Sequence, residues 1–242
     1  MSCRAAAGDG KAALQRKRRG DRMQLENSII NFLGDSITEG AGASDTEHRY
    51  TDVLARMYKL KRANNYGIGG SRIARQVHVT QDRMDRDYCM RYPEMDRNAD
   101  AVVVFGGTND YGHGEAPIGT FADRTPDTFY GACHTLMDGL LTMYTGKPIL
   151  IVTPLRRINE NDPEGEGPGR KLNAHVPLRV YRDILLETAF SYSLPVLDLY
   201  ATSGIQPENE KVRRELLPDG LHPSDAGHAL LARRIGEALR CL

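Results

Sequence analysis

The chain has 242 residues, 40% of them hydrophobic, so one well-buried domain is expected. Its 32 Lys or Arg residues balance its 32 Asp or Glu residues, which gives a formal net charge of zero. No stretch approaches the length of a membrane span. The cysteines at positions 3, 89, 133 and 241 form neither a CxxC pair nor a Cys/His ligand spacing, which argues against a zinc site and a disulfide framework.

The first 22 residues differ in charge from the rest of the chain. They carry seven Lys or Arg and two Asp, a net charge of +5, which leaves 25 basic and 30 acidic residues for the remainder. With no periodic apolar residues, this segment is predicted to be a disordered, dispensable basic tail, followed by a single domain over residues 23–242. Because it also lacks the apolar core of a signal peptide, a cytoplasmic location is expected. Nucleic-acid binding is not expected beyond any weak contribution of the tail.

The first predicted strand, about residues 28–33, ends at Gly34-Asp35-Ser36. A strand that runs into a turn and a helix exposes side chains at the carboxyl edge of an α/β sheet, where such sheets bind ligands. Ser36 is therefore a candidate nucleophile. Ordinary turn or N-cap chemistry would explain the same three residues.

A second, weaker strand is predicted near residues 62–66, between helices near 47–60 and 72–90. Two adjacent glycines, Gly69 and Gly70, follow this strand. A glycine lets a backbone N–H group approach a developing oxyanion closely, so either residue is a candidate donor.

The third predicted strand, residues 101–105, leads into Gly107-Thr108-Asn109-Asp110. The side-chain amide of Asn109 is a second candidate oxyanion donor, although Asn is also an ordinary turn residue. A loop is predicted over residues 111–117, and it would lie at the same edge of the sheet. Such a loop either covers substrate or is an inert insertion.

A helix near residues 126–145 and a fourth strand over 149–152 come next, followed by a polar loop over 156–170. Arg156 and Arg157 at the start of this loop either recognise an anionic substrate or lie in solvent.

The last predicted elements are a helix near residues 175–192, a strand over 195–199 and a helix from Ser224 to about Arg240. Asp219 and His222 precede the final helix. The i, i+3 spacing across a tight turn can place the carboxylate against one imidazole nitrogen while the other faces the serine. His222 would then be the general base, unless both residues merely cap the helix.

Strands and helices alternate along the chain, and three of the strands are almost entirely apolar, as strands covered on both faces are. This pattern predicts an α/β protein, a three-layer α/β/α sandwich around a parallel sheet. All the candidate residues then gather at the carboxyl edge of the sheet or before the last helix.

The ordered set of Gly34-Asp35-Ser36, Gly70, Gly107-Thr108-Asn109-Asp110 and Asp219-Gly220-Leu221-His222 resembles the SGNH, or GDSL-type, hydrolase superfamily over roughly residues 29–238. The resemblance implies a flavodoxin-like sheet of five parallel strands, ester hydrolysis and no cofactor. It assigns the nucleophile to Ser36 and the remaining triad positions to Asp219 and His222. It assigns the oxyanion hole to Ser36, Gly70 and Asn109. The predicted substrate-binding residues are Asp35, Asp110 and His113.

The resulting hypothesis is a metal-independent serine esterase that removes a short acyl group, such as acetyl, from a carbohydrate or another small polar molecule. The sequence contains no Trp and no long apolar segment for lipid docking, which disfavours long acyl chains. A lysophospholipase or thioesterase is the second enzyme hypothesis. A flavin- or nucleotide-binding flavodoxin-like module is the alternative from another class, although Glu39 would repel a phosphate. The sequence does not indicate an oligomeric state.

Overall fold

A computed structural model describes residues 23–161 and 176–242. The predicted basic tail, residues 1–22, lies outside the described residues, and so does the predicted loop from residue 162 onward.

The centre of the molecule is a sheet of five parallel strands in the order β2-β1-β3-β4-β5. The bounds are β1 Ile29–Gly34, β2 Arg62–Gly67, β3 Ala101–Phe105, β4 Ile149–Val152 and β5 Val196–Leu197. In register, Gly34 at the end of β1 lies beside Gly67 of β2 and Phe105 of β3. The loops after these three strands therefore begin at the same height. The α/β fold class and the five-stranded parallel sheet predicted from the sequence are confirmed.

Alternate side chains of the strands enter two separate cores. In β3, Val102 and Val104 pack on one face, whereas Val103 and Phe105 pack on the other. All five residues of this strand are buried. A strand covered on both faces has no polar side, which is why it reads as an uninterrupted apolar run in the sequence.

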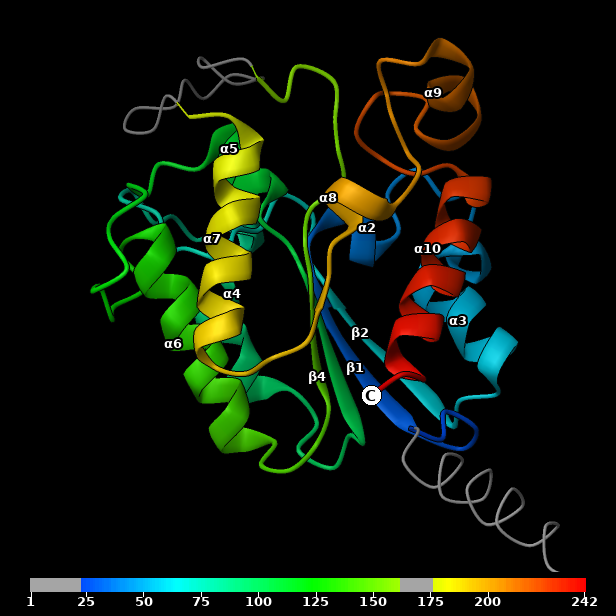
Figure 1. Ribbon diagram of the computed structural model, residues 1–242, viewed down its shortest axis with the longest axis horizontal. Coiled ribbons are helices and arrows are strands. Elements are labelled where there is room, and N and C mark those ends of the chain that lie inside the picture. Colours follow the sequence, from blue (N-terminus) through cyan, green and yellow to red (C-terminus); the bar gives the residue numbers. More distant parts are fainter. Residues whose placement is uncertain (1–22, 162–175) are drawn as a thin grey trace, which may run out of the picture.

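Helices cover both faces, which gives the predicted three layers (Figure 1). One face carries α4 (Tyr88–Arg91), α6 (Phe129–Met143) and α7 (Leu178–Ser191). The other carries α3 (Tyr50–Tyr58) and α10 (Asp225–Leu239), which pack against each other.

Short helices gather at the carboxyl edge of the sheet (Figure 1). They are α2 (Ser36–Glu39) after β1, α5 (Thr108–His113) after β3 and α8 (Leu199–Thr202) after β5. In the sequence, helix α9 (Glu210–Leu216) follows α8 and precedes α10. Three 3-10 helices complete the described elements: η1 Thr46–His48, η2 Arg83–Asp85 and η3 Tyr92–Glu94.

The prediction of a helix near residues 72–90 is wrong. Only η2 and α4 form there, because the backbone of this segment bonds to distant groups instead of to itself. The N–H groups of Ile73 and Ala74 donate to the carboxylate of Asp110, and Arg75 N–H donates to Pro126 O at 2.8 Å. The loop predicted over residues 111–117 is also partly wrong, since α5 continues to His113.

No helix among the residues that the structure describes is both long and apolar enough to cross a bilayer.

Candidate active site

Three side chains from distant parts of the sequence form a hydrogen-bonded row. Ser36 Oγ lies 3.0 Å from His222 Nε2, and His222 Nδ1 lies 2.7 Å from Asp219 Oδ2. A carboxylate only accepts hydrogen bonds, so Nδ1 carries the proton and Nε2 is free to accept one from the Ser36 hydroxyl. The imidazole therefore has the tautomer that a general base for this serine requires.

Ser36 is the first residue of α2, directly after β1. The carboxylate of Asp35 caps this helix by accepting from Ile37 N–H at 3.0 Å. Gly34 is required at the turn, because a Cβ atom there would lie 1.9 Å from Thr38 Oγ1. The N–H of Ser36 belongs to the first turn of the helix, where backbone donors have no intrahelical partner.

A tight turn before α10 presents His222. Asp219 Oδ1 accepts from the N–H groups of Leu221 and His222, at 2.9 and 2.7 Å, and Gly220 has a φ of +81°. Burial would raise the pKa of Asp219, but the hydrogen bonds from His222 and Leu221 lower it below its ordinary value. Asp219 thus remains the carboxylate that the imidazole needs as a partner.

The loop after β2 distinguishes the two adjacent glycines. Gly69 N–H donates to Glu39 Oε2 at 2.7 Å, so this donor is already engaged. Gly70 has a φ of +75°, and within the described part of the chain its N–H makes no hydrogen bond. Of the two N–H groups, that of Gly70 is available to an oxyanion.

Asn109 lies on α5, in the second position after the turn at Gly107. Its Nδ2 donates to Ser71 O at 3.1 Å, and its Oδ1 lies 3.3 Å from His113 Nε2. A side-chain amide has two N–H groups, so one remains after the bond to Ser71. This second N–H and that of Gly70 come from neighbouring loops that the Ser71 contact ties together.

Two of the predicted substrate-binding residues have structural partners. Asp35 caps α2, and Asp110 holds the loop at Ile73 and Ala74. Burial raises the pKa of each carboxyl to about 6. A substrate-binding role for Asp35 and Asp110 stays a prediction, and their contacts do not favour it.

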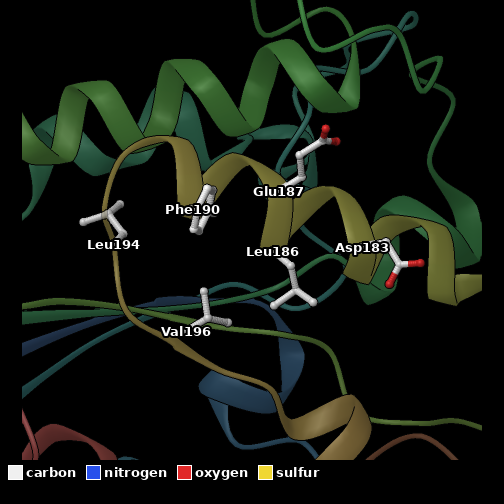
Figure 2. A pocket seen from close by; sticks show the side chains of 6 residues that line it. All are labelled: Asp183, Leu186, Glu187, Phe190, Leu194 and Val196. Carbon is white, nitrogen blue, oxygen red and sulfur yellow. The ribbon is translucent and has the colours of Figure 1, made fainter.

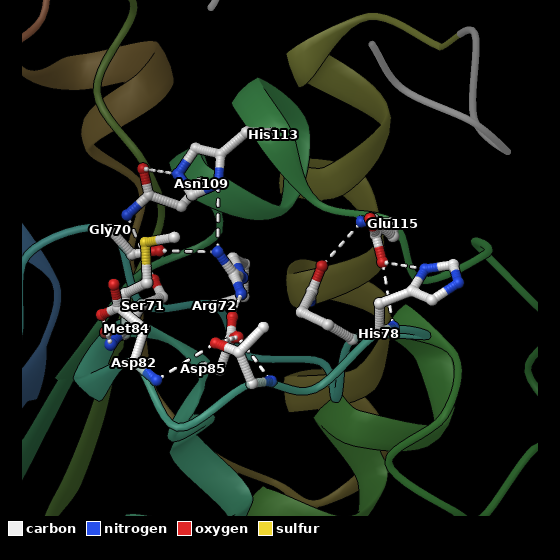
Figure 3. Close-up of polar contacts among 12 residues, drawn as sticks. Gly70, Ser71, Arg72, His78, Asp82, Met84, Asp85, Asn109, His113 and Glu115 are labelled. Atoms are coloured by element: carbon white, nitrogen blue, oxygen red, sulfur yellow. Dashed lines mark hydrogen bonds and ion pairs between the residues drawn. The ribbon is translucent and has the colours of Figure 1, made fainter. Parts of the chain in front are cut away.

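The third, His113, is only partly buried and sits between Asn109 and Arg72 (Figure 3). Arg72 and Glu39 were not recognised as site residues in the sequence. Each is separated from its partners by loops, so no local spacing marks it, and only the folded contacts reveal it.

Arg157, at the start of the loop after β4, does not lie in solvent, and recognition of an anionic substrate by Arg156 or Arg157 stays a prediction. Arg157 is buried, and its guanidinium donates to Thr108 O and Thr108 Oγ1, both at 3.2 Å. Arg156 forms an ion pair with Glu160. Arg156 also donates to the hydroxyl of Tyr200 in α8 at 3.3 Å, so both arginines hold the start of the loop against neighbouring elements.

An apolar groove lies elsewhere, between α7 and β5 (Figure 2). Its lining consists of Asp183, Leu186, Glu187, Phe190, Leu194 and Val196. These residues include no Ser, Cys or His, so the groove has no side chain like those of Ser36 and His222. Among the described residues, no cluster of three or more His, Cys, Asp or Glu is placed to hold a metal ion.

Comparison with protein families matches residues 32–230 to the GDSL-like Lipase/Acylhydrolase family. A solved structure of a protein from Lactobacillus plantarum is 30% identical to the chain, with a TM-score of 0.75, and the match covers 89% of this chain and 97% of that one. The comparison with curated proteins gave no match.

Two further solved structures share the fold. A lipase/acylhydrolase from Enterococcus faecalis is 22% identical, with a TM-score of 0.59 and coverage of 88% of this chain and 96% of that one. An acetyl xylan esterase, AlAXEase, is 21% identical, with a TM-score of 0.59 and coverage of 87% and 99%. At these identities the likeness shows the fold alone.

Proposed function

Because the chain belongs to the GDSL-like lipase/acylhydrolase family, and is therefore an ester-hydrolysing enzyme, we propose that it acts through Ser36 as nucleophile, with His222 as general base and Asp219 as its partner. The observation that carries the proposal is the row of contacts from Ser36 Oγ through the imidazole to the Asp219 carboxylate, at 3.0 and 2.7 Å.

In the proposed reaction, Ser36 Oγ attacks the carbonyl carbon of the ester while its proton moves to His222 Nε2. The tetrahedral intermediate then collapses, and the imidazolium protonates the departing alcohol. A water molecule, activated by the same imidazole, hydrolyses the acyl-serine and restores the enzyme. Asp219 stabilises the imidazolium that forms in each half of the cycle.

The proposed oxyanion hole consists of the N–H groups of Ser36 and Gly70 and the side-chain amide of Asn109. Donors fixed before the reaction cost no reorganisation when charge develops on the carbonyl oxygen, which is why they accelerate acyl transfer. The engagement of Gly69 N–H by Glu39 supports Gly70 as the backbone donor in the second loop.

The proposed substrate is a short acyl ester, most plainly an acetyl ester, of a carbohydrate or another small polar molecule. The composition supports this choice, because the chain has no Trp and no long apolar segment that could dock on lipid. The second candidate, a lysophospholipase or thioesterase, uses the same catalytic residues. A flavin- or nucleotide-binding module would need neither Asp219 nor His222. The cytoplasmic location expected from the sequence stays a prediction.

The nucleophile is tested by replacing Ser36 with Ala and measuring hydrolysis of p-nitrophenyl acetate. We expect kcat to fall by about 10⁴-fold or more, and a similar loss for His222→Ala, because members of such a unit fail together. Ser191→Ala is the matched control, since this serine lies at the end of α7 and its hydroxyl donates to Thr188 O within its own helix. Near-normal turnover by a folded Ser36→Ala variant would refute the proposed mechanism.

Acyl preference is tested on p-nitrophenyl esters of increasing chain length, alongside acetylated sugars and a lysophospholipid. A kcat/KM that is highest for acetyl and falls with length supports the proposed substrate. A kcat/KM that rises with length would favour the lysophospholipase or thioesterase alternative.

A further inference from the structure

A buried arginine lies behind the proposed oxyanion hole. Arg72 is 4% exposed and forms an ion pair with Asp85, which also accepts from Thr80 N–H and Thr80 Oγ1 at 2.9 and 2.5 Å. Burial would raise the pKa of Asp85, but these bonds and the Arg72 cation lower it below its ordinary value. The guanidinium is therefore held in place by a charged partner on the side away from the hole.

The other side of Arg72 contacts Gly70 and His113. Its NH1 group donates to Gly70 O at 3.3 Å and lies 3.1 Å from His113 Nδ1 (Figure 3). A guanidinium has donors and no acceptor, so His113 Nδ1 must be the acceptor of this bond. The imidazole is then neutral, with its proton on Nε2.

This tautomer, together with the carbonyl of Ser71, sets which way the Asn109 amide points. His113 Nε2 lies 3.3 Å from Asn109 Oδ1. Because this nitrogen carries the proton, the oxygen of the amide is the acceptor. The nitrogen then lies on the opposite side, where it donates to Ser71 O and keeps one N–H for an oxyanion. The reversed amide would set its oxygen against Ser71 O and remove that donor.

From this directed chain of donors and acceptors we propose that Arg72 and His113 are positioning residues that hold the Asn109 amide, and the Gly70 carbonyl beside it, in the orientation that oxyanion binding requires. The inference rests on the proposed esterase function. It gives His113 a role different from the substrate contact expected from the sequence, because the ring acts through Asn109. Burial, reinforced by the charges of Arg72 and Arg157, lowers the pKa of His113 to about 4, which agrees with a neutral ring.

The test replaces His113 with Phe, which keeps a ring and removes both nitrogens, and with Gln, whose amide offers an acceptor to Arg72 and a donor to Asn109. We expect His113→Phe to lower kcat on p-nitrophenyl acetate by about 10- to 100-fold with little change in KM, because a misplaced catalytic donor costs rate. His113→Gln should restore most of this loss. Arg72→Met is a less suitable variant, since it leaves Asp85 buried without its cation.

A double-mutant cycle shows whether His113 acts through Asn109. In an Asn109→Ala background, we expect His113→Phe to cost less than about 3-fold in kcat, because the group it positions is gone. The same loss in both backgrounds would overturn the proposal, and so would a rise in KM at unchanged kcat, which would mark a direct substrate contact. His78→Phe is the control: this exposed ring pairs with Glu115, away from Asn109, and the kcat of the variant should stay within about 2-fold of wild type.

A second readout does not depend on activity. In ¹⁵N NMR spectra of the wild-type protein at pH 7, His113 should carry its proton on Nε2, and a proton on Nδ1 would overturn the proposal. If the protein hydrolyses no ester in a Ser36-dependent way, the proposed function fails, whereas the tautomer of His113 is still decided by the spectrum.

Discussion

The amide of Asn109 makes three contacts in the proposed mechanism, two with the protein and one with the oxyanion. Ser71 O and His113 hold it in the resting structure, and the remaining N–H would bind charge that exists only near the transition state. An interaction of this kind contributes to kcat and little to substrate affinity.

We therefore expect Asn109→Ala to lower kcat by about 10²- to 10³-fold with little change in KM. Steady-state kinetics on p-nitrophenyl acetate measure both constants, and Asn98→Ala, at an exposed position, is the control. A change confined to KM would reassign Asn109 to binding of the ground state.

At the level of elements, the position of His222, the proposed base, depends on how the segment before α10 docks on the loop after α2. Gly42 has a φ of +88°, and a Cβ atom there would lie 2.2 Å from Pro223 O and 3.1 Å from His222 Cβ. The side chain of Asp225 accepts from Ser44 N–H and Ser44 Oγ, both at 2.8 Å. Close backbone contact thus sets the distance between His222 and Ser36, the proposed base and nucleophile.

Gly42→Ala should consequently lower kcat by about 10-fold or more, because the new methyl group displaces the His222 segment from Ser36. Gly146→Ala is a matched control: its φ of +76° imposes the same backbone strain, but nothing lies within 4 Å of the added atom. For that variant we expect a Tm lower by about 2–8 °C, from about 1–2 kcal/mol of strain, and unchanged kinetics. Equal kinetic effects of the two substitutions would contradict this account.

The predictability of elements from the sequence follows their environment. Residues 101–105 and 149–152 were predicted with the observed bounds, because burial on both faces leaves only apolar side chains. The strand predicted over 195–199 is reduced to Val196–Leu197, the last strand in the order of the described sheet, which pairs with β4 on one side. The prediction of a helix over 72–90 fails because the hydrogen-bonding partners of this segment, such as Asp110 and Pro126, are remote in the chain.

The candidate site divides in the same way. Ser36, Asn109 and His222 stand in short local patterns at the ends of elements, and such patterns are visible in a sequence. Arg72 and Glu39 act through tertiary contacts with Gly70 and Gly69, and no sequence spacing encodes those contacts. For this reason the sequence alone does not distinguish Gly69 from Gly70 as the candidate oxyanion donor.

For the molecule as a whole, two carboxyls buried beneath the site make stability depend on pH. Burial raises the pKa values of Asp35 and Asp110 from 3.8 to about 6, so between pH 4 and 6 the folded chain holds protons that the unfolded chain has lost. Their contribution to stability is fully present below about pH 4 and is lost as the pH rises through about 6.

Asp35→Asn removes one of these groups and keeps an oxygen that can cap α2. From pH 4 to pH 7 the unfolding free energy of the variant should fall by about 2 kcal/mol less than that of the wild type, because a carboxyl whose pKa rises from 3.8 to about 6 loses most of its contribution in this range. Urea denaturation at the two pH values measures this difference. An Asp35→Asn protein with the wild-type difference between pH 4 and pH 7 would show that Asp35 titrates normally in the fold.

The distance along the chain between Ser36 and His222 has a consequence for biosynthesis. They are 186 residues apart, and a ribosome that adds about 5–20 residues per second makes the serine roughly 10–40 s before the histidine. During that interval the nascent polypeptide carries a hydroxyl that nothing deprotonates. We therefore expect translation intermediates that end before His222 to be inert toward cellular esters, and hydrolysis to begin only after the segment before α10 has been made and has docked.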